Sequence, residues 1–361
     1  MSDRPDEANA VTEVLLSDLE SRLKKEYEQA AHKAQEKLDD YLRRFEIKDK
    51  IKRKQLQAGE ITRKEYNNWR TGQIMIGKRW EEMRDALADD LRNTDKIARS
   101  IIDGYKPDVY ALNHNYATFC VERDSLVDTS YSLYHREAVE YIMRENPDLL
   151  PPPGKRVKTA IAEGRAVRWQ RQQVQSVVMQ SIFIGDSIPE IAKRVSNTLG
   201  ERNLGNSIRY ARTAMTGAQN AGRLDAFRRA DKMGIKTRKT WIAALDSRTR
   251  HEHRKLDRQT VDIDAPFQNA FGRIMYPGDP NAAAANIWNC RCTMVSQIAG
   301  FERDFGDLRL RNTEKLGDMT YEEWLKAKPI YNPIKLPAEK AEAIKKSYIA
   351  EYRSAAARLG M

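Results

Sequence analysis

The most restrictive feature of this 361-residue sequence is a long stretch without helix-breaking residues. Neither proline nor glycine occurs between Pro5 and Gly59, and apolar residues recur every three to four positions from Val11 to Phe45. This spacing places the apolar side chains on one face of a helix. We therefore expect residues 10–45 to form one long amphipathic helix that packs against other helices.

Similar patterns predict further helices along the chain. Thr62 and Glu65 form a capping-box sequence, whose two side chains satisfy free backbone amides at a helix start. The helix that follows is expected over 63–103 and should end at Gly104 and Pro107. Further helical segments are expected over residues 108–145, 157–183, 188–195, 206–232 and 338–358.

The run from Pro151 to Pro153, followed by Gly154, is the strongest interruption of the chain. We place a domain boundary there. Strand-like segments over 237–245 and 291–298 predict a small antiparallel sheet, covered by the 206–232 helix. The expected fold is mostly α, with a long N-terminal helical bundle and a small α+β module near the C-terminus. The expected segments are an extended helical domain (1–150), a hinge with connecting helices (151–205), the α+β domain (206–300) and a C-terminal extension with a terminal helix (301–361).

Positive charge is concentrated in the middle of the chain. Residues 151–260 contain 23 Lys and Arg against 9 Asp and Glu, whereas residues 1–150 carry a net charge of −4. A basic surface attracts a polyanion without reading its sequence, and it can equally face an acidic protein surface. The candidate DNA contacts lie on or after the 206–232 helix: Arg209, Arg223, Arg228, Arg229, Lys236 and Lys239.

The composition disfavours several classes of protein. No apolar run approaches the roughly 18 residues of a membrane span, and the polar N-terminus lacks the features of a secretory signal. Three cysteines do not make a disulfide framework, so a reducing cytoplasm is expected. The sequence contains neither the GxSxG motif of serine hydrolases nor the GxxxxGK[ST] phosphate-binding loop.

Two short clusters contain the residues with the most versatile chemistry. Asp246, His251 and His253 follow the first expected strand, and Cys290 and Cys292 lie at the beginning of the last one. Thiolates and imidazole are ligands that zinc prefers, so His253, Cys290 and Cys292, with Asp246 or His251, are a candidate zinc site. A catalytic zinc would also need an open ligand position and a general base such as Glu252.

The alternative interpretation of the same clusters is purely structural, and it is the favoured one. The two cysteines would pack as small buried thiols. Asp246 and Arg250 would form a buried ion pair, and Asn289 would close a turn.

The order and spacing of these residues resemble the phage minor head protein family, the Mu F-like head morphogenesis domain. The resemblance is strong over 208–295 and loose over the preceding helices. Two positions depart from the family pattern, Ala214 where a glutamate is common and Arg258 where a glycine is common. The matching residues are Arg212, Thr213, Trp241, Asp246, Arg248, Thr249, Arg250, His253, Tyr276, Pro277, Gly278, Asp279, Asn289, Cys290, Arg291 and Cys292.

The resemblance implies a non-enzymatic, low-copy virion protein of a tailed phage, made in the host cytoplasm and located inside the head near the portal. Its partners would be the portal protein, major capsid or scaffold proteins, and packaged DNA contacted without sequence preference, with no membrane and no cofactor. Such proteins act in procapsid assembly and in DNA packaging or delivery.

Some family members carry a C-terminal toxin domain. The roughly 60 residues after the motif region are too few for an added enzyme domain of ordinary size. The alternative function is a metal-dependent, nuclease-like enzyme or toxin that uses Asp246, His253, Cys290 and Cys292.

Overall fold

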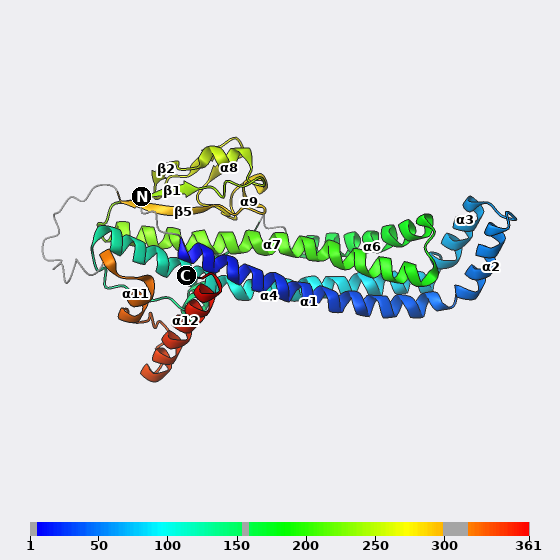
Figure 1. The fold of residues 1–361 in the computed structure, drawn as a ribbon, viewed down its shortest axis with the longest axis horizontal. Helices are drawn as coiled ribbons and strands as arrows, with labels where there is room; N and C mark the ends of the chain where they lie inside the picture. The colour runs from blue at the N-terminus through cyan, green and yellow to red at the C-terminus, as the bar shows by residue number, and fades with distance from the viewer. Residues whose placement is uncertain (1–5, 154–158, 299–316, 361) are drawn as a thin grey trace. The chain divides into compact units, whose positions relative to one another are not determined.

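A computed structural model describes residues 6–153, 159–298 and 317–360 (Figure 1). The chain is mostly helical, with small antiparallel sheets in its C-terminal part, which confirms the expected fold class. Gly154 and the first part of the expected C-terminal extension lie outside the described residues. Within the described residues, no helix has both the length and the apolar character needed to cross a membrane.

The chain forms two compact units, each assembled from separate stretches of sequence. Three long helices contribute residues to both units: α1 (Glu7–Arg43), α4 (Lys78–Ser125) and α7 (Ile188–Lys232). The first unit comprises residues 1–19, 102–156 and 209–361, and the second comprises residues 20–101 and 157–208.

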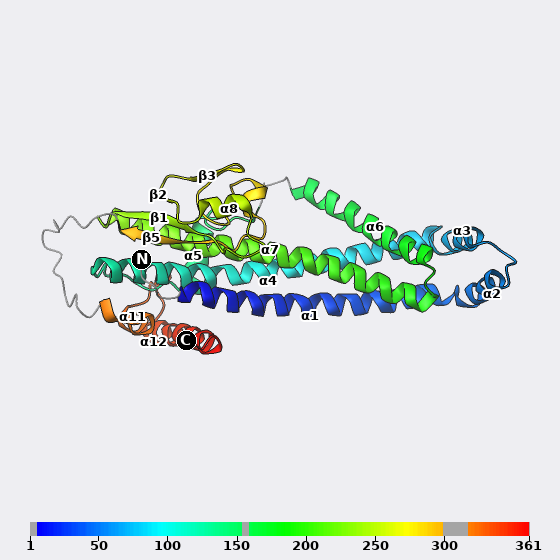
Figure 2. The same cartoon turned by 45° about the horizontal axis from the view of Figure 1, so that its top comes forward.

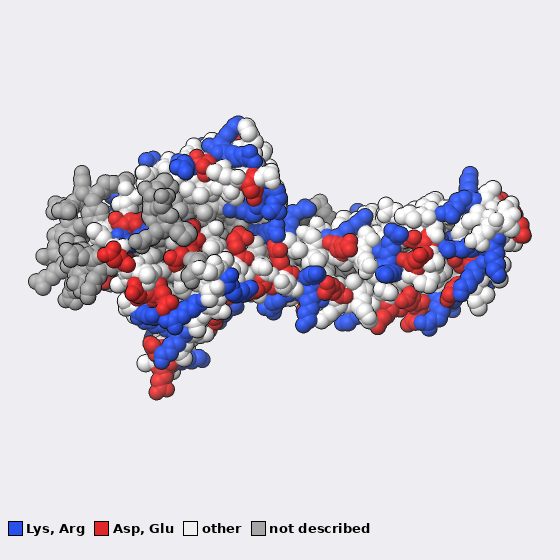
Figure 3. All heavy atoms as spheres, viewed as in Figure 1, with Lys and Arg blue, Asp and Glu red and all other residues white. Residues whose placement is uncertain are grey.

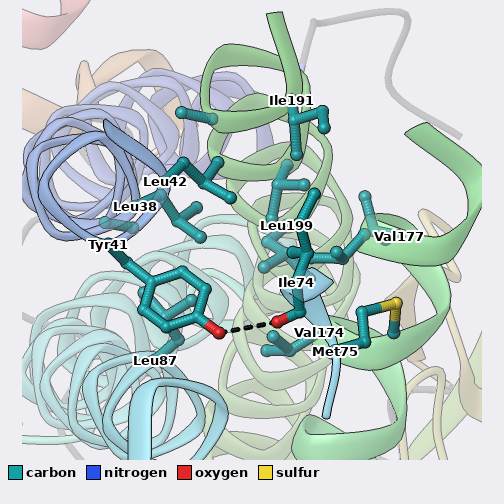
Figure 4. Close-up of a cluster of buried hydrophobic side chains, with 14 of the residues drawn as sticks. Leu38, Tyr41, Leu42, Ile74, Met75, Leu87, Val174, Val177, Ile191 and Leu199 are labelled. Atoms are coloured by element: carbon teal, nitrogen blue, oxygen red, sulfur yellow. Dashed lines mark hydrogen bonds between the residues drawn. The ribbon is translucent and has the colours of Figure 1, made fainter. Parts of the chain in front are cut away.

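The second unit is a helical bundle around an apolar core (Figure 4). Leu38, Tyr41 and Leu42 of α1 contribute to this core, as the periodic spacing predicted, and the Tyr41 hydroxyl donates a hydrogen bond of 2.6 Å to the Ile74 carbonyl. The remaining helices of this unit are α2 (Glu46–Gln57), α3 (Arg63–Ile74) and α6 (Thr159–Ile184).

The helix boundaries between residues 62 and 145 are only partly as expected. The capping box of Thr62 and Glu65 is confirmed at the start of α3. The single helix expected over 63–103 is wrong, because α3 ends at Ile74 and Gly77 adopts a φ of +93°, a left-handed conformation that favours glycine.

The expected break at Gly104 and Pro107 is also wrong, since α4 runs through both residues to Ser125. A proline inside a helix costs about 3 kcal/mol. Val109, Tyr110 and Ala111, which follow the proline, are buried. We attribute the continuation of the helix to this packing, which offsets the lost hydrogen bond.

The helix expected over 108–145 is interrupted after Ser125, and α5 covers Arg136–Glu145. The buried Glu122 carboxylate organises the chain at this point. It accepts hydrogen bonds from the Thr129 amide at 2.9 Å and from Trp324 Nε1 at 2.7 Å, and it pairs with Lys328 Nζ at 2.8 Å. These contacts hold α11 (Tyr321–Ala327) against the end of α4. The expected terminal helix is confirmed as α12 (Ala338–Arg358).

The small sheet lies against the C-terminal part of α7 (Figures 1 and 2). The helices expected over 188–195 and 206–232 are one continuous helix, and its Leu224 and Phe227 pack against Met294 of the sheet. The central strand β1 (Thr237–Ile242) pairs antiparallel with β2 (Thr260–Asp262) and β5 (Thr293–Ile298). The remaining elements are the hairpin of β3 (Phe267–Asn269) and β4 (Gly272–Ile274), and the short helices α8 (His251–Leu256) and α9 (Ala284–Ile287).

Candidate functional site

The two clusters singled out in the sequence meet in the interior of the first unit. His253 lies on α8, and Cys290 and Cys292 immediately precede β5. The Nδ1 atom of His253 is 3.5 Å from Sγ of Cys290 and 3.7 Å from Sγ of Cys292. The three side chains are buried, with exposed fractions of 1%, 2% and 3%. The site therefore brings together three of the four residues that were proposed to bind zinc.

The two thiols influence each other's pKa. The pKa of the Cys292 thiol is lowered, because hydrogen bonds with Cys290 and then with His253 stabilise its thiolate. The same interaction, together with burial, raises the pKa of Cys290. The arrangement favours one proton held between two sulfur atoms beside an imidazole.

Apolar side chains surround the three ligand atoms. The Trp241 ring meets the His253 ring edge-on at 5.4 Å and the Phe267 ring edge-on at 5.2 Å. Both cysteines belong to the same apolar cluster as these aromatic residues. The Nε2 atom of His253 is buried and has no hydrogen-bond partner among the described residues. The three ligand atoms thus lie in an apolar interior that leaves one ring nitrogen unsatisfied.

Asp246, the fourth proposed ligand, lies outside the group of ligand atoms found among the described residues. Its carboxylate pairs with Arg291 and accepts hydrogen bonds from the Arg248 amide at 2.9 Å and the Thr249 hydroxyl at 3.1 Å. These contacts, above all the one with Arg291, lower the pKa of Asp246.

The expected pair of Asp246 with Arg250 is replaced by this contact, and Arg250 donates instead to the Trp288 carbonyl. Arg291, which lies between the two cysteines in the sequence, therefore connects them to Asp246 in the turn after β1.

His251 and Glu252 do not have the roles proposed for them from the sequence, a fourth zinc ligand and a general base. The His251 side chain is 78% exposed, which directs it away from the buried cluster. Glu252 pairs with Lys255 at 2.7 Å and accepts a hydrogen bond from the Ala270 amide at 2.9 Å. These contacts, that with Lys255 first, lower the pKa of Glu252 to about 2, which makes it a weak base. Glu252 thus fixes the β3–β4 turn to α8.

The cysteine segment is also anchored to α7, through one row of polar side chains. The backbone N–H of Asn289 donates a hydrogen bond of 2.9 Å to the Thr213 hydroxyl. Asn289 has a φ of +55°, and the chain turns at this residue. The Thr216 hydroxyl donates to the Cys290 carbonyl at 2.7 Å, and Asn220 Nδ2 donates to the Cys292 carbonyl at 3.3 Å. Thr216 and Asn220 were not predicted from the sequence, although successive steps of three and four residues from Thr213 place all three on one helix face.

The Pro277–Asp279 turn reaches α7 by direct backbone contact. A Cβ atom at Gly278 would lie 2.6 Å from the Gly217 nitrogen, and one at Gly217 would lie 2.9 Å from the Gly278 oxygen. Two glycines are therefore required for this approach. Asp279 closes the turn by accepting hydrogen bonds from the amides of Met275 at 3.1 Å and Asn281 at 2.9 Å.

The candidate DNA contacts divide into buried and exposed residues. Arg223 is buried and pairs with Asp6 at 2.6 Å, and Lys239 is buried and donates to the Met275 carbonyl at 2.9 Å. Neither side chain is therefore accessible to a nucleic acid. Arg228 pairs with Asp264 at 2.8 Å and Arg229 lies over the Tyr131 ring at 5.1 Å, while Arg209 and Lys236 are exposed.

Comparisons with known proteins give the site its context. A family described as phage Mu protein F like protein matches residues 172–295. The chain is 29% identical to minor head protein GP7 of Bacillus phage SPP1 over 238 residues, which cover 60% of this chain and 75% of GP7.

A second relative is the NAD(+)--arginine ADP-ribosyltransferase EFV of Enterococcus faecalis, with 27% identity over 252 residues, 66% of this chain and 48% of that protein. The chain thus spans about half the length of this enterococcal relative. No solved structure matches the chain significantly.

The family match contains every motif residue from Arg212 to Cys292. Residues 172–295 thus match a phage Mu protein F-like domain, and the chain is a homologue of minor head protein GP7.

Proposed function

We propose that this chain is a minor head protein that binds at the portal vertex of a tailed phage and acts in procapsid assembly and in DNA packaging or delivery. The observation that carries the proposal is the similarity to GP7, which extends over three quarters of that protein. The geometry of the motif agrees with a role in assembly. Asp246, Glu252, Asp279 and Arg291 all hold segments of the domain together.

The experiment that tests the proposal is co-expression of this chain with the portal protein of the same phage, followed by affinity purification of the portal ring. We expect the chain to co-purify with the ring and to enter procapsids assembled with the portal. The control is the major capsid protein assembled without a portal, which should recruit much less of the chain. Equal recruitment with and without the portal would contradict the proposed location.

We also propose that the domain contacts packaged DNA through exposed basic side chains. Lys and Arg gather over the α8 segment on the face shown in Figure 3, with acidic residues between them. The exposed basic residues of this domain include Arg209, Lys236 and Arg248, which lie on separate segments of the chain. Contacts with phosphates release counterions, so affinity for duplex DNA should fall steeply with salt and should not depend on sequence.

This contact is tested by replacing Arg209, Lys236 and Arg248 with alanine in the full chain. If all three side chains contact phosphates, the slope of log affinity against log salt concentration should become less steep by about 2.7, since each contact contributes about 0.9. The matched control replaces three exposed lysines of α1 or α2, and its slope should stay unchanged: Lys24, Lys33 and Lys48. The same slope for both variants would contradict the assignment.

An enzymatic function is the second candidate, because one relative is an ADP-ribosyltransferase. We infer that the 48% of that relative covered by this chain corresponds to the Mu F-like part, and that its transferase activity lies elsewhere. The purified chain should therefore not transfer labelled ADP-ribose from NAD⁺ to arginine. Labelled product from this chain, and none after heat inactivation, would favour the enzymatic function.

A further inference from the structure

We propose that His253, Cys290 and Cys292 bind a zinc ion that joins α8 to the start of β5. The ligand types fit this metal, because zinc prefers thiolate sulfur and imidazole nitrogen. The three side chains come from the two ends of a long loop region, between which β2, β3, β4 and α9 lie. One ion at this point would close that whole region.

The distances agree with tetrahedral coordination. Zinc lies about 2.3 Å from sulfur and about 2.05 Å from nitrogen, so two such ligands at a tetrahedral angle are separated by about 3.6 Å. The two observed separations between His253 Nδ1 and the sulfur atoms are 3.5 Å and 3.7 Å. All three ligand atoms lie within 4.8 Å of one another. The site is therefore already arranged around one common point.

Simple packing of two thiols and a histidine explains this arrangement less well. Hydrogen bonds between the His253 ring and the two sulfur atoms account for the short distances, but not for the second ring nitrogen. The imidazole also leaves Nε2 buried without a partner among the described residues, which costs free energy. A zinc bond to Nδ1 would give His253 a strong interaction that offsets this cost.

The burial of the site defines what the ion would do. Among the described residues, no fourth His, Cys, Asp or Glu joins the group, so a water molecule would complete the coordination. Three ligands and a water are also found in catalytic zinc sites. Here all three ligands are at most 3% exposed, so a macromolecular substrate has no access to the ion. The zinc would be structural, and its binding energy would stabilise the fold.

The test is the metal content of the full-length chain, purified without chelators and measured by inductively coupled plasma mass spectrometry. We expect one zinc per chain. Cys290→Ser and Cys292→Ser should each lose most of it. Cys120→Ser is the matched control, because Cys120 is the remaining cysteine and lies outside the ligand group, and it should retain the zinc. Asp246→Asn should also retain it, because that carboxylate pairs with Arg291.

A second measurement applies if the cysteine variants do not fold. The wild-type chain is grown with cobalt in place of zinc, and thiolate coordination then gives a sulfur-to-cobalt charge-transfer band in the absorption spectrum. A folded wild-type chain without zinc and without this band would overturn the proposal. So would a disulfide between Cys290 and Cys292 in the intact mass, or zinc that remains bound in both serine variants.

Discussion

Gly222 provides a sharp test of the packing between α7 and α4 in the first unit. A Cβ atom at this position would lie 2.6 Å from the Tyr110 carbonyl oxygen and 3.2 Å from the His114 nitrogen. Both contacts are with backbone, which cannot move aside as a flexible side chain would. Gly222→Ala should therefore destabilise the protein, although alanine is the better helix former.

The expected magnitude follows from two opposing effects. Overpacking costs about 1–3 kcal/mol, and we expect the upper half of this range because the contacts are with backbone. The gain from alanine over glycine in a helix interior is roughly 1 kcal/mol. The net loss of about 1–2 kcal/mol should lower the melting temperature by about 2–8 °C for a unit of this size.

The matched control is Gly205→Ala in the same helix. A Cβ atom at Gly205 would have no neighbour within 4 Å, so the helix gain should appear alone and the melting temperature should rise. The assay is thermal unfolding followed by circular dichroism. Equal increases in melting temperature for both variants would refute the close approach of the two helices.

Two further predictions concern buried charges. Burial lowers the pKa of Lys239 from 10.5 to about 8, so the folded chain binds fewer protons than the unfolded chain between these values. The stability of the wild type relative to Lys239→Met should therefore increase as pH rises from 8 to 10.5 in urea unfolding experiments, and a constant difference would contradict the burial of this charge. Glu122→Ala removes the buried partner of Lys328, which keeps the exposed Asp128, and it leaves Trp324 Nε1 without its acceptor; it should cost about 3–5 kcal/mol. An unchanged urea midpoint would contradict the role of Glu122.

Helix periodicity and local capping could be predicted from the sequence because they depend on neighbouring residues. The stripe from Val11 to Phe45 gave α1, and the Thr62–Glu65 pair gave the start of α3. The continuation of α4 through Pro107 could not be predicted, because it depends on packing by residues such as Tyr110, which contacts Asp225 of another helix at 2.9 Å. Tertiary packing thus outweighed a strong local signal.

The residues of the candidate metal site could be predicted from the sequence, but the ion pair of Asp246 beside it could not. The sequence placed His253 beside Cys290 and Cys292, since they are the residues with metal-binding chemistry. It assigned Asp246 the wrong arginine, because the choice between Arg250 and Arg291 depends on how the turn after β1 folds.

A count of charges in the sequence also does not show which charged residues are buried. Arg223 and Lys239 contribute to the basic middle segment of the sequence, yet their side chains satisfy Asp6 and a backbone carbonyl in the interior. The net charge of a segment therefore overstates the charge available for binding DNA.

We infer that the histidine and cysteine segments hold the Mu F-like domain together. The most direct measurement is amide hydrogen exchange of the full chain carrying His253→Ala, compared with the wild type. The account predicts faster exchange in both α8 and β5 of the variant, while α12 exchanges as in the wild type. Unchanged protection of β5 in the variant would show that these residues do not hold the domain together, and would contradict the account.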